Sequence, residues 1–363
     1  MTQAYAIERT GSVAVIGGGI IGASVAWRLA QRNWRVTLFD KGSLGGEASW
    51  AAAGMLSPGG EIEAPSDFAS LATESRRLYS AFISELEEVS GLAIDYQECG
   101  ALDLAYSRLE WEALEARAAR QAEIGIPSKQ VAPHRVAMFW PRIRTEGLVG
   151  AFFYPDDATV NAREVMVALG AACRKTGVSI LQDCPVQTIQ ISDKEATIKS
   201  GPREESFEAA VIAAGAWSNA IAVKGVPALP PAEPVKGHLI GYQQPEQSCH
   251  TVVRHGQGYL LQRANGLLIC GASIEHVGFD REIRPEMVTW LAEQAQFVFP
   301  HLRGTAPSDV WTGLRPGSDA LHVGSWHSNR LYLAYGHYRN GILLAPLTAD
   351  RIASEITASL QRQ

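Results

Sequence analysis

The feature that most constrains the fold is a glycine-rich turn between an apolar strand and an apolar helix near the start of the chain. Residues 13–22 read VAVIGGGIIG, so Gly17, Gly19 and Gly22 form a G-x-G-x-x-G pattern directly after the strand. A second strand, VTLFD, ends at Asp40. Strand, turn, helix, second strand and acidic residue together predict a binding site for a dinucleotide.

Each of these residues has a physical role in such a site. Gly17 permits the tight turn, Gly19 lets a pyrophosphate approach the backbone, and Gly22 lets the helix pack closely on the strand. The helix N-terminus offers unpaired N–H groups and a positive dipole end to the phosphates. Asp40 is expected to accept hydrogen bonds from ribose hydroxyls. An ordinary glycine-rich turn, the alternative, would not need three spaced glycines together with Asp40.

Composition restricts the class of protein. The 363 residues suffice for two domains, and 46% hydrophobic with 19% charged residues is typical of a globular protein. A net charge of -6 without a long Lys/Arg run argues against a nucleic-acid partner. No apolar stretch approaches the roughly 20 residues of a membrane span. The N-terminal residues 1–11 lack the basic and apolar regions of a secretory signal.

Cysteine and histidine usage favours the cytoplasm and argues against a metal site. Five scattered cysteines, an odd number, do not suggest a disulfide framework and favour a reducing compartment. The chain has no C-x-x-C and no H-E-x-x-H, and its nine histidines show no metal-ligand spacing. We therefore expect no bound metal.

The rest of the chain alternates predicted helices and strands. Residues 67–90 carry an apolar stripe at helical spacing, whereas 207–216, FEAAVIAAGA, are typical of a fully buried parallel strand. Residues 45–58 are rich in small side chains and are expected to form neither a plain loop nor a helix of their own. Short strand-like runs between 239 and 274 predict an antiparallel sheet. Further helices are predicted over 109–124, 162–175, 281–299 and through 352–360, and further strands over 101–106 and 148–154.

These elements predict an α/β protein with two domains. A Rossmann-like domain binds the dinucleotide, and a second domain with an antiparallel sheet binds substrate. Four prolines between 227 and 234 indicate a stiff connection between the two. A site at the domain boundary is expected. The predicted nucleotide domain is discontinuous and comprises residues 10–90, 147–220 and 305–363, and the substrate domain comprises 91–146 and 221–304.

Six segments together resemble one known family. They read VIGGGIIG at 15–22, GGEASWAAAGM at 45–55, VIAAGAWS at 211–218, VKG at 235–237, GLRPG at 313–317 and GHYRNGILLAP at 336–346. Spread in this order over nearly the whole chain, they are similar to the glycine oxidases of bacterial thiamine biosynthesis, within the D-amino-acid oxidase superfamily of FAD-dependent amine oxidases. The resemblance makes FAD the expected dinucleotide. Because no cysteine lies near 313–316 or 336–341, we expect it to be bound non-covalently.

The resemblance implies a substrate site. Arg315 is the expected clamp, because a planar guanidinium can bind a carboxylate through two parallel hydrogen bonds. Tyr259 would donate to the same carboxylate, Met55 would lie near the substrate, and Arg339 would lie beside the substrate or the flavin. The alternatives are structural: a core tyrosine, a methionine that fills a gap, and surface arginines.

The resemblance also implies the residues that contact FAD. Small side chains at 51–54 let the backbone approach the flat flavin ring. Backbone N–H groups and a helix start at 337–343 can face the flavin N1–C2=O edge. Pro346 must then lie in the first helical turn or leave a kink. The expected cofactor residues are Gly17, Gly19, Ile20, Ile21, Gly22, Asp40, Lys41, Ala48, Ser49, Ala53, Gly54, Met55, Val186, His337, Tyr338, Arg339, Asn340, Gly341, Ile342 and Leu343.

The activity implied by the resemblance is oxidative deamination of glycine, sarcosine and small D-amino acids. Hydride passes from the substrate Cα to flavin N5, and the products are a keto acid (glyoxylate from glycine), ammonia and hydrogen peroxide. The glycine imine would supply the thiazole of thiamine. This chemistry needs no general acid or base, so no catalytic residue is expected and His238 and His337 are assigned structural roles. A homotetramer is also implied.

Three other functions compete with this one. A D-amino-acid or sarcosine dehydrogenase would pass its electrons to a quinone or another protein instead of O2. An FAD-bearing module of an RNA-modifying enzyme is disfavoured by the net negative charge and the lack of a basic stripe. An NAD dehydrogenase would not need the flavin motifs around Met55 and Arg339.

Overall fold

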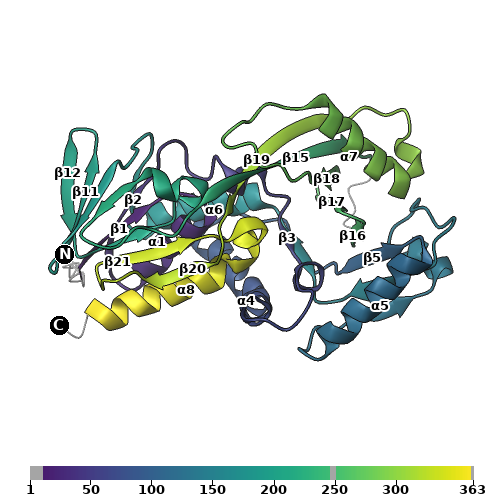
Figure 1. Ribbon diagram of the computed structural model, residues 1–363, viewed down its shortest axis with the longest axis horizontal. Coiled ribbons are helices and arrows are strands. Elements are labelled where there is room, and N and C mark those ends of the chain that lie inside the picture. Colours follow the sequence, from purple (N-terminus) through teal and green to yellow (C-terminus); the bar gives the residue numbers. More distant parts are fainter. Residues whose placement is uncertain (1–10, 246–250, 361–363) are drawn as a thin grey trace, which may run out of the picture.

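The computed structural model describes residues 11–245 and 251–360, and the predictions for the N-terminal residues 1–10 and for Cys249 lie outside these ranges. Figure 1 shows an elongated molecule with two sheet-based parts, one at each end. Strands β1 (Ser12–Ile16) and β21 (Leu331–Tyr335) mark one part, and β17 (Gly258–Gln262) and β5 (Ala101–Ala105) mark the other. The predicted fold class is confirmed.

The first part is built on a six-stranded sheet with the order β20-β21-β13-β1-β2-β9. Its strands are parallel except β20, which pairs antiparallel with β21. Every residue of β1 and of β13 is buried, which explains their continuous apolar sequences. One face of the sheet packs against the long helices, and the other packs against the small sheet that contains β10 (Thr188–Ile191), β11 (Ala196–Ser200) and β12 (Arg203–Phe207). The remaining strands are β2 (Arg35–Phe39), β9 (Ser179–Leu181), β13 (Ala209–Ile212) and β20 (His322–Ser325).

Long helices pack against this sheet and against one another. Helix α1 (Ile20–Gln31) contacts α6 (Ala162–Lys175) and α8 (Gly341–Leu360), and α4 (Asp67–Ser90) contacts the same two helices. The bounds predicted for α4 and α6 are confirmed. The hydroxyl of Ser66 caps the start of α4, and Gly91 ends it in a left-handed conformation with φ 74°.

The second part is an eight-stranded sheet with the order β19-β15-β18-β17-β16-β5-β7-β6. Its neighbours run antiparallel except β16 and β5, so the predicted antiparallel sheet is confirmed with one parallel pair. Helix α7 (Pro285–Val298) contacts β15, β17 and β18, and α5 (Arg108–Ala122) contacts β5 and β7. The other strands are β6 (Lys129–Val131), β7 (Gly150–Tyr154), β15 (Glu233–Gln243), β16 (Val252–His255), β18 (Leu267–Gly271) and β19 (Asp309–Gly317).

Two small sheets and several short helices complete the fold. The small sheets have the orders β12-β11-β10-β14 and β3-β8-β4. Their strands are β3 (Met55–Leu56), β4 (Tyr96–Gln97), β8 (Ala158–Val160), β10 (Thr188–Ile191), β11 (Ala196–Ser200), β12 (Arg203–Phe207) and β14 (Ala222–Lys224). The short helices are α2 (Ala48–Ala51) and α3 (Pro58–Glu61) and the 3-10 helices η1 (Pro133–Met138), η2 (Gly215–Ala220), η3 (Pro300–Leu302) and η4 (Tyr338–Asn340).

Two sequence predictions differ from this structure in detail, and for Pro346 the first of the two predicted alternatives, a place in the first helical turn, is excluded. Residues 45–58 do contain a helix of their own, α2, although it is one turn long. The strand predicted over 207–216 covers only Ala209–Ile212, because the chain turns into η2 at Gly215, where φ is +57°. Pro346 lies inside α8 beyond its first turn.

The division into two domains remains a prediction, and four strands pair across its boundary: β4 with β8, β14 with β10, β7 with β5 and β6, and β19 with β15. Strands β7 and β19 belong to segments that were assigned to the nucleotide domain. In the structure β7 pairs with β5 and β6, and β19 pairs with β15, so both lie in the eight-stranded sheet. Strand pairing is non-local, so an apolar run in the sequence did not reveal which sheet it would join.

Candidate functional site

The glycine turn has the geometry that its spacing predicted. Gly17 has a φ of +104°, and a Cβ there would overlap the carbonyl of Ala213 on the neighbouring strand. A Cβ at Gly22 would overlap the carbonyl oxygen of Gly17, so helix α1 can approach the strand only with glycine at this position. The turn therefore leaves the N-terminus of α1 open to a ligand.

Asp40 holds this turn in shape. Its Oδ2 accepts a hydrogen bond from the backbone N–H of Gly18 at 2.6 Å, and its Oδ1 accepts one from Gly42 at 2.8 Å. The carboxylate thus ties the end of β2 to the turn after β1. Each oxygen has a further lone pair, so contact with a ribose hydroxyl remains a prediction.

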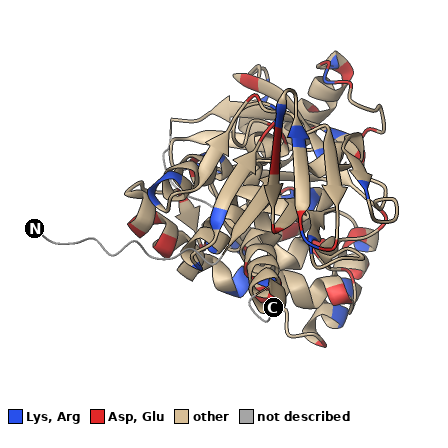
Figure 2. Ribbon diagram, turned by 90° about the vertical axis from the view of Figure 1, so that its left-hand side faces the viewer, with Lys and Arg blue, Asp and Glu red and all other residues tan. Residues whose placement is uncertain are grey.

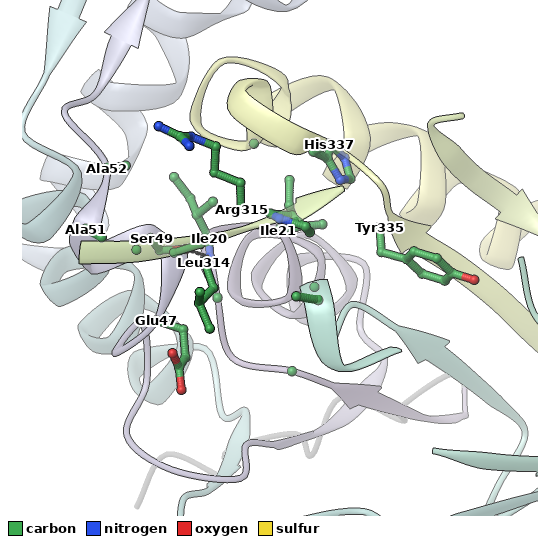
Figure 3. Close-up of a pocket in the computed structure, with 18 of the residues that line it drawn as sticks. Ile20, Ile21, Glu47, Ser49, Ala51, Ala52, Leu314, Arg315, Tyr335 and His337 are labelled. Atoms are coloured by element: carbon green, nitrogen blue, oxygen red, sulfur yellow. Dashed lines mark hydrogen bonds between the residues drawn. The ribbon is translucent and has the colours of Figure 1, made fainter. Parts of the chain in front are cut away.

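A pocket with a volume of about 480 Å³ runs from this turn toward the eight-stranded sheet. Figure 3 shows residues of α1, α2 and β19 around the same space. All but two of the predicted cofactor and substrate residues line it. Gly22 packs beneath the turn instead, and Leu343 is buried in α8. The pocket-lining residues among the predictions are Gly17, Gly19, Ile20, Ile21, Asp40, Lys41, Ala48, Ser49, Ala53, Gly54, Met55, Val186, Tyr259, Arg315, His337, Tyr338, Arg339, Asn340, Gly341 and Ile342.

One wall of the pocket is the small-residue segment that ends at Met55. Trp311 donates from Nε1 to the carbonyl of Ala51 at 3.0 Å, and the Arg263 guanidinium donates to the carbonyl of Ala53. Arg263 is 4% exposed, and burial lowers its pKa to about 10. These side chains hold the backbone of the wall in position without placing bulky groups in the pocket.

Arg315 lies on β19 with its guanidinium directed toward the pocket. Nη1 donates to the backbone carbonyls of Ser273 at 3.0 Å and Lys236 at 3.3 Å. Figure 3 shows Leu314 leaving the strand in the opposite direction, as alternation along a strand requires. Burial lowers the pKa of Arg315, but the ordinary pKa of a guanidinium is high enough that the group stays charged at neutral pH. Nε and Nη2 make no hydrogen bond to the residues that the structure describes, which leaves one edge of the guanidinium for an anion.

Strand register places Tyr259 on the same sheet face as Arg315. Trp311, Leu239, Gly271 and Tyr259 are successive partners across the sheet, and Arg315 lies four positions beyond Trp311. Burial raises the pKa of Tyr259 to about 12, so its hydroxyl remains a donor at neutral pH. No described residue hydrogen-bonds this hydroxyl. An unpaired guanidinium and an unpaired phenol on one face can bind a small carboxylate.

Glycine keeps that face open. A Cβ at Gly237 would overlap the guanidinium of Arg315, and one at Gly271 would overlap the phenol of Tyr259. A Cβ at Gly313 would meet the side chain of Ala51. Gly237 of the VKG segment thus makes room for the guanidinium of Arg315, and Gly271 makes room for the phenol of Tyr259.

The turn that precedes α8 forms another wall of the pocket and adjoins the N-terminus of that helix. Tyr338 has a φ of +49° and Gly336 one of +85°, so the chain reverses direction just before the helix. His337 is 4% exposed, and its Nε2 lies 3.0 Å from the Thr348 hydroxyl. Burial lowers the pKa of His337 to about 3, so the ring is neutral. The N-terminus of α8 at Gly341 and Ile342 lines the pocket.

Several pocket residues were missed from the sequence. Glu61 pairs with Arg339 at 2.7 Å, and Glu47 pairs with Lys41 at 3.0 Å. Lys41 also lies 3.5 Å from the ring centre of Trp217. No motif marks Glu61, whose partner lies 278 positions away in the sequence, and Glu47 lies within the GGEASWAAAGM segment but was not singled out there. Other pocket residues that were not predicted include Ser57, Cys184, Gln257, Ile274 and Tyr335.

His238 has a structural environment. It is 0% exposed, its Nδ1 lies 2.8 Å from a carboxylate oxygen of Glu275, and its Nε2 accepts from the N–H of Arg284 at 3.0 Å. Within residues 11–245 and 251–360, no group of three His, Cys, Asp or Glu side chains could hold a metal ion. Among the helices of the same residues, none is long and apolar enough to cross a membrane.

Comparison with known proteins identifies the family. The profile described as "DAO: FAD dependent oxidoreductase" matches residues 12–355, almost the whole chain. This protein belongs to the DAO family. It is thus an FAD-dependent amine oxidoreductase, and the glycine turn, the small-residue wall and the N-terminus of α8 fit that cofactor.

Individual relatives agree with this assignment. The glycine oxidase of Geobacillus kaustophilus is 33% identical over 94% of this chain and 91% of its own. The crystal structure of glycine oxidase from the same organism superimposes with a TM-score of 0.89, at 30% identity, over 96% of this chain and 95% of the other. The bifunctional protein ThiO/ThiG of Synechocystis is 31% identical over 96% of this chain, which spans 52% of that protein.

Proposed function

We propose that this DAO-family protein oxidises glycine, and also sarcosine and small D-amino acids, with O2 as electron acceptor. The balanced reaction for glycine is glycine + H2O + O2 → glyoxylate + NH3 + H2O2. When bound, FAD would supply the two-electron acceptor for the hydride of the substrate Cα, and O2 would be the final electron acceptor. The observation that carries the proposal is Arg315, a partly buried guanidinium that pairs with no carboxylate among the described residues and lies on the same sheet face as Tyr259, whose hydroxyl has no described hydrogen-bond partner.

The protein's own residues would orient the substrate. Arg315 is held by two backbone carbonyls, so its free edge is fixed before a carboxylate arrives. Tyr259 donates from the same face of the sheet, and Met55 bounds the space on the side of the small-residue wall. Fixing the carboxylate fixes the direction of Cα, and such orientation accounts for much of the rate in a reaction without an acid or base residue.

The cofactor would be held by the residues around the glycine turn and α8. The N-termini of α1 and α8 both face the pocket, so one can bind the pyrophosphate and the other the flavin edge where negative charge develops. The proposal includes non-covalent attachment. In support, the imidazole of His337 is buried against Thr348. Contact of Val186 with adenine remains a proposal, as do the predicted domain boundaries.

Partners and location follow from sequence and resemblance. Figure 2 shows Lys and Arg interspersed with Asp and Glu over the end of the molecule that carries the six-stranded sheet. With a net charge of -6, this mixture supports a small-molecule substrate and not nucleic acid. A cytoplasmic location, a homotetramer and supply of the glycine imine to thiazole synthesis are parts of the proposal. The relative with a fused ThiG portion supports the last of these.

One experiment tests the reaction. The yellow holoenzyme is mixed with glycine without oxygen, and the flavin absorbance is followed before and after air is admitted. Bleaching by glycine, followed by recolouring with release of hydrogen peroxide, is the expected result. Bleaching without rapid recovery in air would assign a dehydrogenase with another acceptor. Unchanged absorbance with glycine, sarcosine and D-alanine would refute amine oxidation.

A further inference from the structure

Two arginines line the substrate end of the pocket, but they differ in their partners. Within residues 11–245 and 251–360, no carboxylate lies within ion-pairing distance of Arg315. Arg339, in contrast, donates from Nη2 to Oε2 of Glu61 at 2.7 Å. Burial lowers the pKa of Arg315, and the charges of Arg339 and Glu61 act on it in opposite directions. The pocket therefore presents one uncompensated cation to a ligand instead of two.

Buried polar groups fix Glu61 in place. Glu61 is the last residue of the single turn α3, and its side chain is 14% exposed. The buried carboxylate of Asp157 accepts from the N–H of Gly59 at 3.1 Å. The buried amide of Gln121 donates to the carbonyls of Gly59 at 2.9 Å and of Ile62 at 2.6 Å. Because both ends of the turn are held, the ion pair with Arg339 forms without ordering the backbone.

We propose that Glu61 is a specificity-determining residue that neutralises Arg339 and thereby restricts the pocket to substrates with one anionic group. This inference rests on the proposed oxidation of small amino acids. A second free guanidinium would favour a ligand with two carboxylates, because each would gain charge-assisted hydrogen bonds. Glu61 removes that attraction and adds repulsion of a second carboxylate, so it acts against the wrong substrate as well as for the right one.

Sarcosine and iminodiacetate form a matched pair of probes. Both are secondary amines with an N-carboxymethyl group, and iminodiacetate carries one additional carboxylate. For the Glu61→Gln holoenzyme, kcat/KM for iminodiacetate relative to sarcosine should rise by about tenfold over the wild type, equivalent to about 1.4 kcal/mol. In the double variant Glu61→Gln/Arg339→Gln the ratio should return close to the wild-type value, because the freed cation is gone.

A binding measurement separates this inference from the proposed function. Dissociation constants for malonate and acetate are measured from the perturbation of the bound flavin absorbance, which requires no turnover. Malonate should gain about tenfold relative to acetate in Glu61→Gln. If the wild type is not reduced by glycine or sarcosine, the proposed function fails, and the malonate-to-acetate ratio still tests Glu61.

A surface ion pair provides the control. Glu74 on α4 pairs with Arg351 on α8 at 2.9 Å, and both side chains are about half exposed and outside the pocket. Glu74→Gln should leave both ratios unchanged. Unchanged ratios in Glu61→Gln would overturn the inference. A gain that persists in the double variant would overturn it as well, because Arg339 would then not be the cation that Glu61 neutralises.

Discussion

Replacing Tyr79 by phenylalanine should destabilise the protein through its effect on a proline in another helix. Pro346 lies inside α8 and has no N–H, so the carbonyl of Ile342, four residues earlier, lacks its usual helical donor. The hydroxyl of Tyr79 on α4 donates to this oxygen at 2.6 Å, and Tyr79 is 0% exposed. Because Ile342 also lines the pocket, this bond supports the cofactor end of α8.

The size of the effect follows from the buried carbonyl. Phenylalanine keeps the ring and leaves no large cavity, so the change removes only the donor. A buried acceptor without a partner costs roughly 1–3 kcal/mol, and we expect Tyr79→Phe to lower the free energy of unfolding by about 2 kcal/mol. Urea unfolding of the holoenzyme at a fixed FAD concentration, followed by far-ultraviolet circular dichroism, measures it.

A double-mutant cycle isolates the role of Pro346. In a Pro346→Ala background, the new N–H can donate to Ile342, so Tyr79→Phe should cost at least roughly 1 kcal/mol less there. Tyr106→Phe is the matched control, because its hydroxyl donates to the carbonyl of Arg144 at 2.6 Å, just beyond the end of β5 and away from α8. That substitution should cost the same in both backgrounds. An equal cost of Tyr79→Phe with and without Pro346 would refute the reasoning.

Three further predictions concern the site. Arg315→Ala should lower kcat/KM for glycine by roughly 100-fold or more while FAD stays bound, and steady-state kinetics with a nearly unchanged KM would contradict the clamp. Asp40→Asn leaves a single side-chain oxygen, so one of the N–H groups of Gly18 and Gly42 loses its acceptor. The FAD dissociation constant, measured by fluorescence titration, should rise about tenfold. An unchanged dissociation constant would show that Asp40 does not hold the turn for FAD. Burial lowers the pKa of His337 to about 3, so the unfolded chain takes up this proton first as pH falls. The contribution of His337 to the free energy of unfolding is complete above about pH 6.5 and is lost toward pH 3, by up to about 1.4 kcal/mol per pH unit. His337→Asn should make the free energy of unfolding depend less steeply on pH in this range. Identical slopes in the variant and the wild type would show that His337 does not cause the dependence.

The sequence predicted those features of the fold that depend on residues within a single segment, such as helix bounds and tight turns. Helices α4 and α6 have the predicted bounds because their apolar stripes and caps are contained within each segment. Gly17 and Gly22 could be assigned because a turn conformation and a close approach each require glycine. The pairing of Glu61 with Arg339 joins residues 278 positions apart, so no spacing rule contains it. The resemblance to a family supplied Arg315 and Tyr259, whereas strand register explains why they share a face.

The pairing of β15 with β19 has a consequence for how ligands exchange. The hydrogen-bonded ladder is continuous from the pair Glu233 and Gly317 to the pair Gly241 and Asp309. Strand β19 carries Arg315, and it also contacts α2 and η2, which lie beside the predicted nucleotide site. Both strands belong to the eight-stranded sheet, so rigid-body opening between the two ends would have to separate β19 from α2 and η2. Substrate exchange is therefore a matter of local gating at rim side chains such as the half-exposed Ile274. The guanidinium and the glycine turn form one mechanical unit, so weakening the ladder should impair substrate and cofactor binding together.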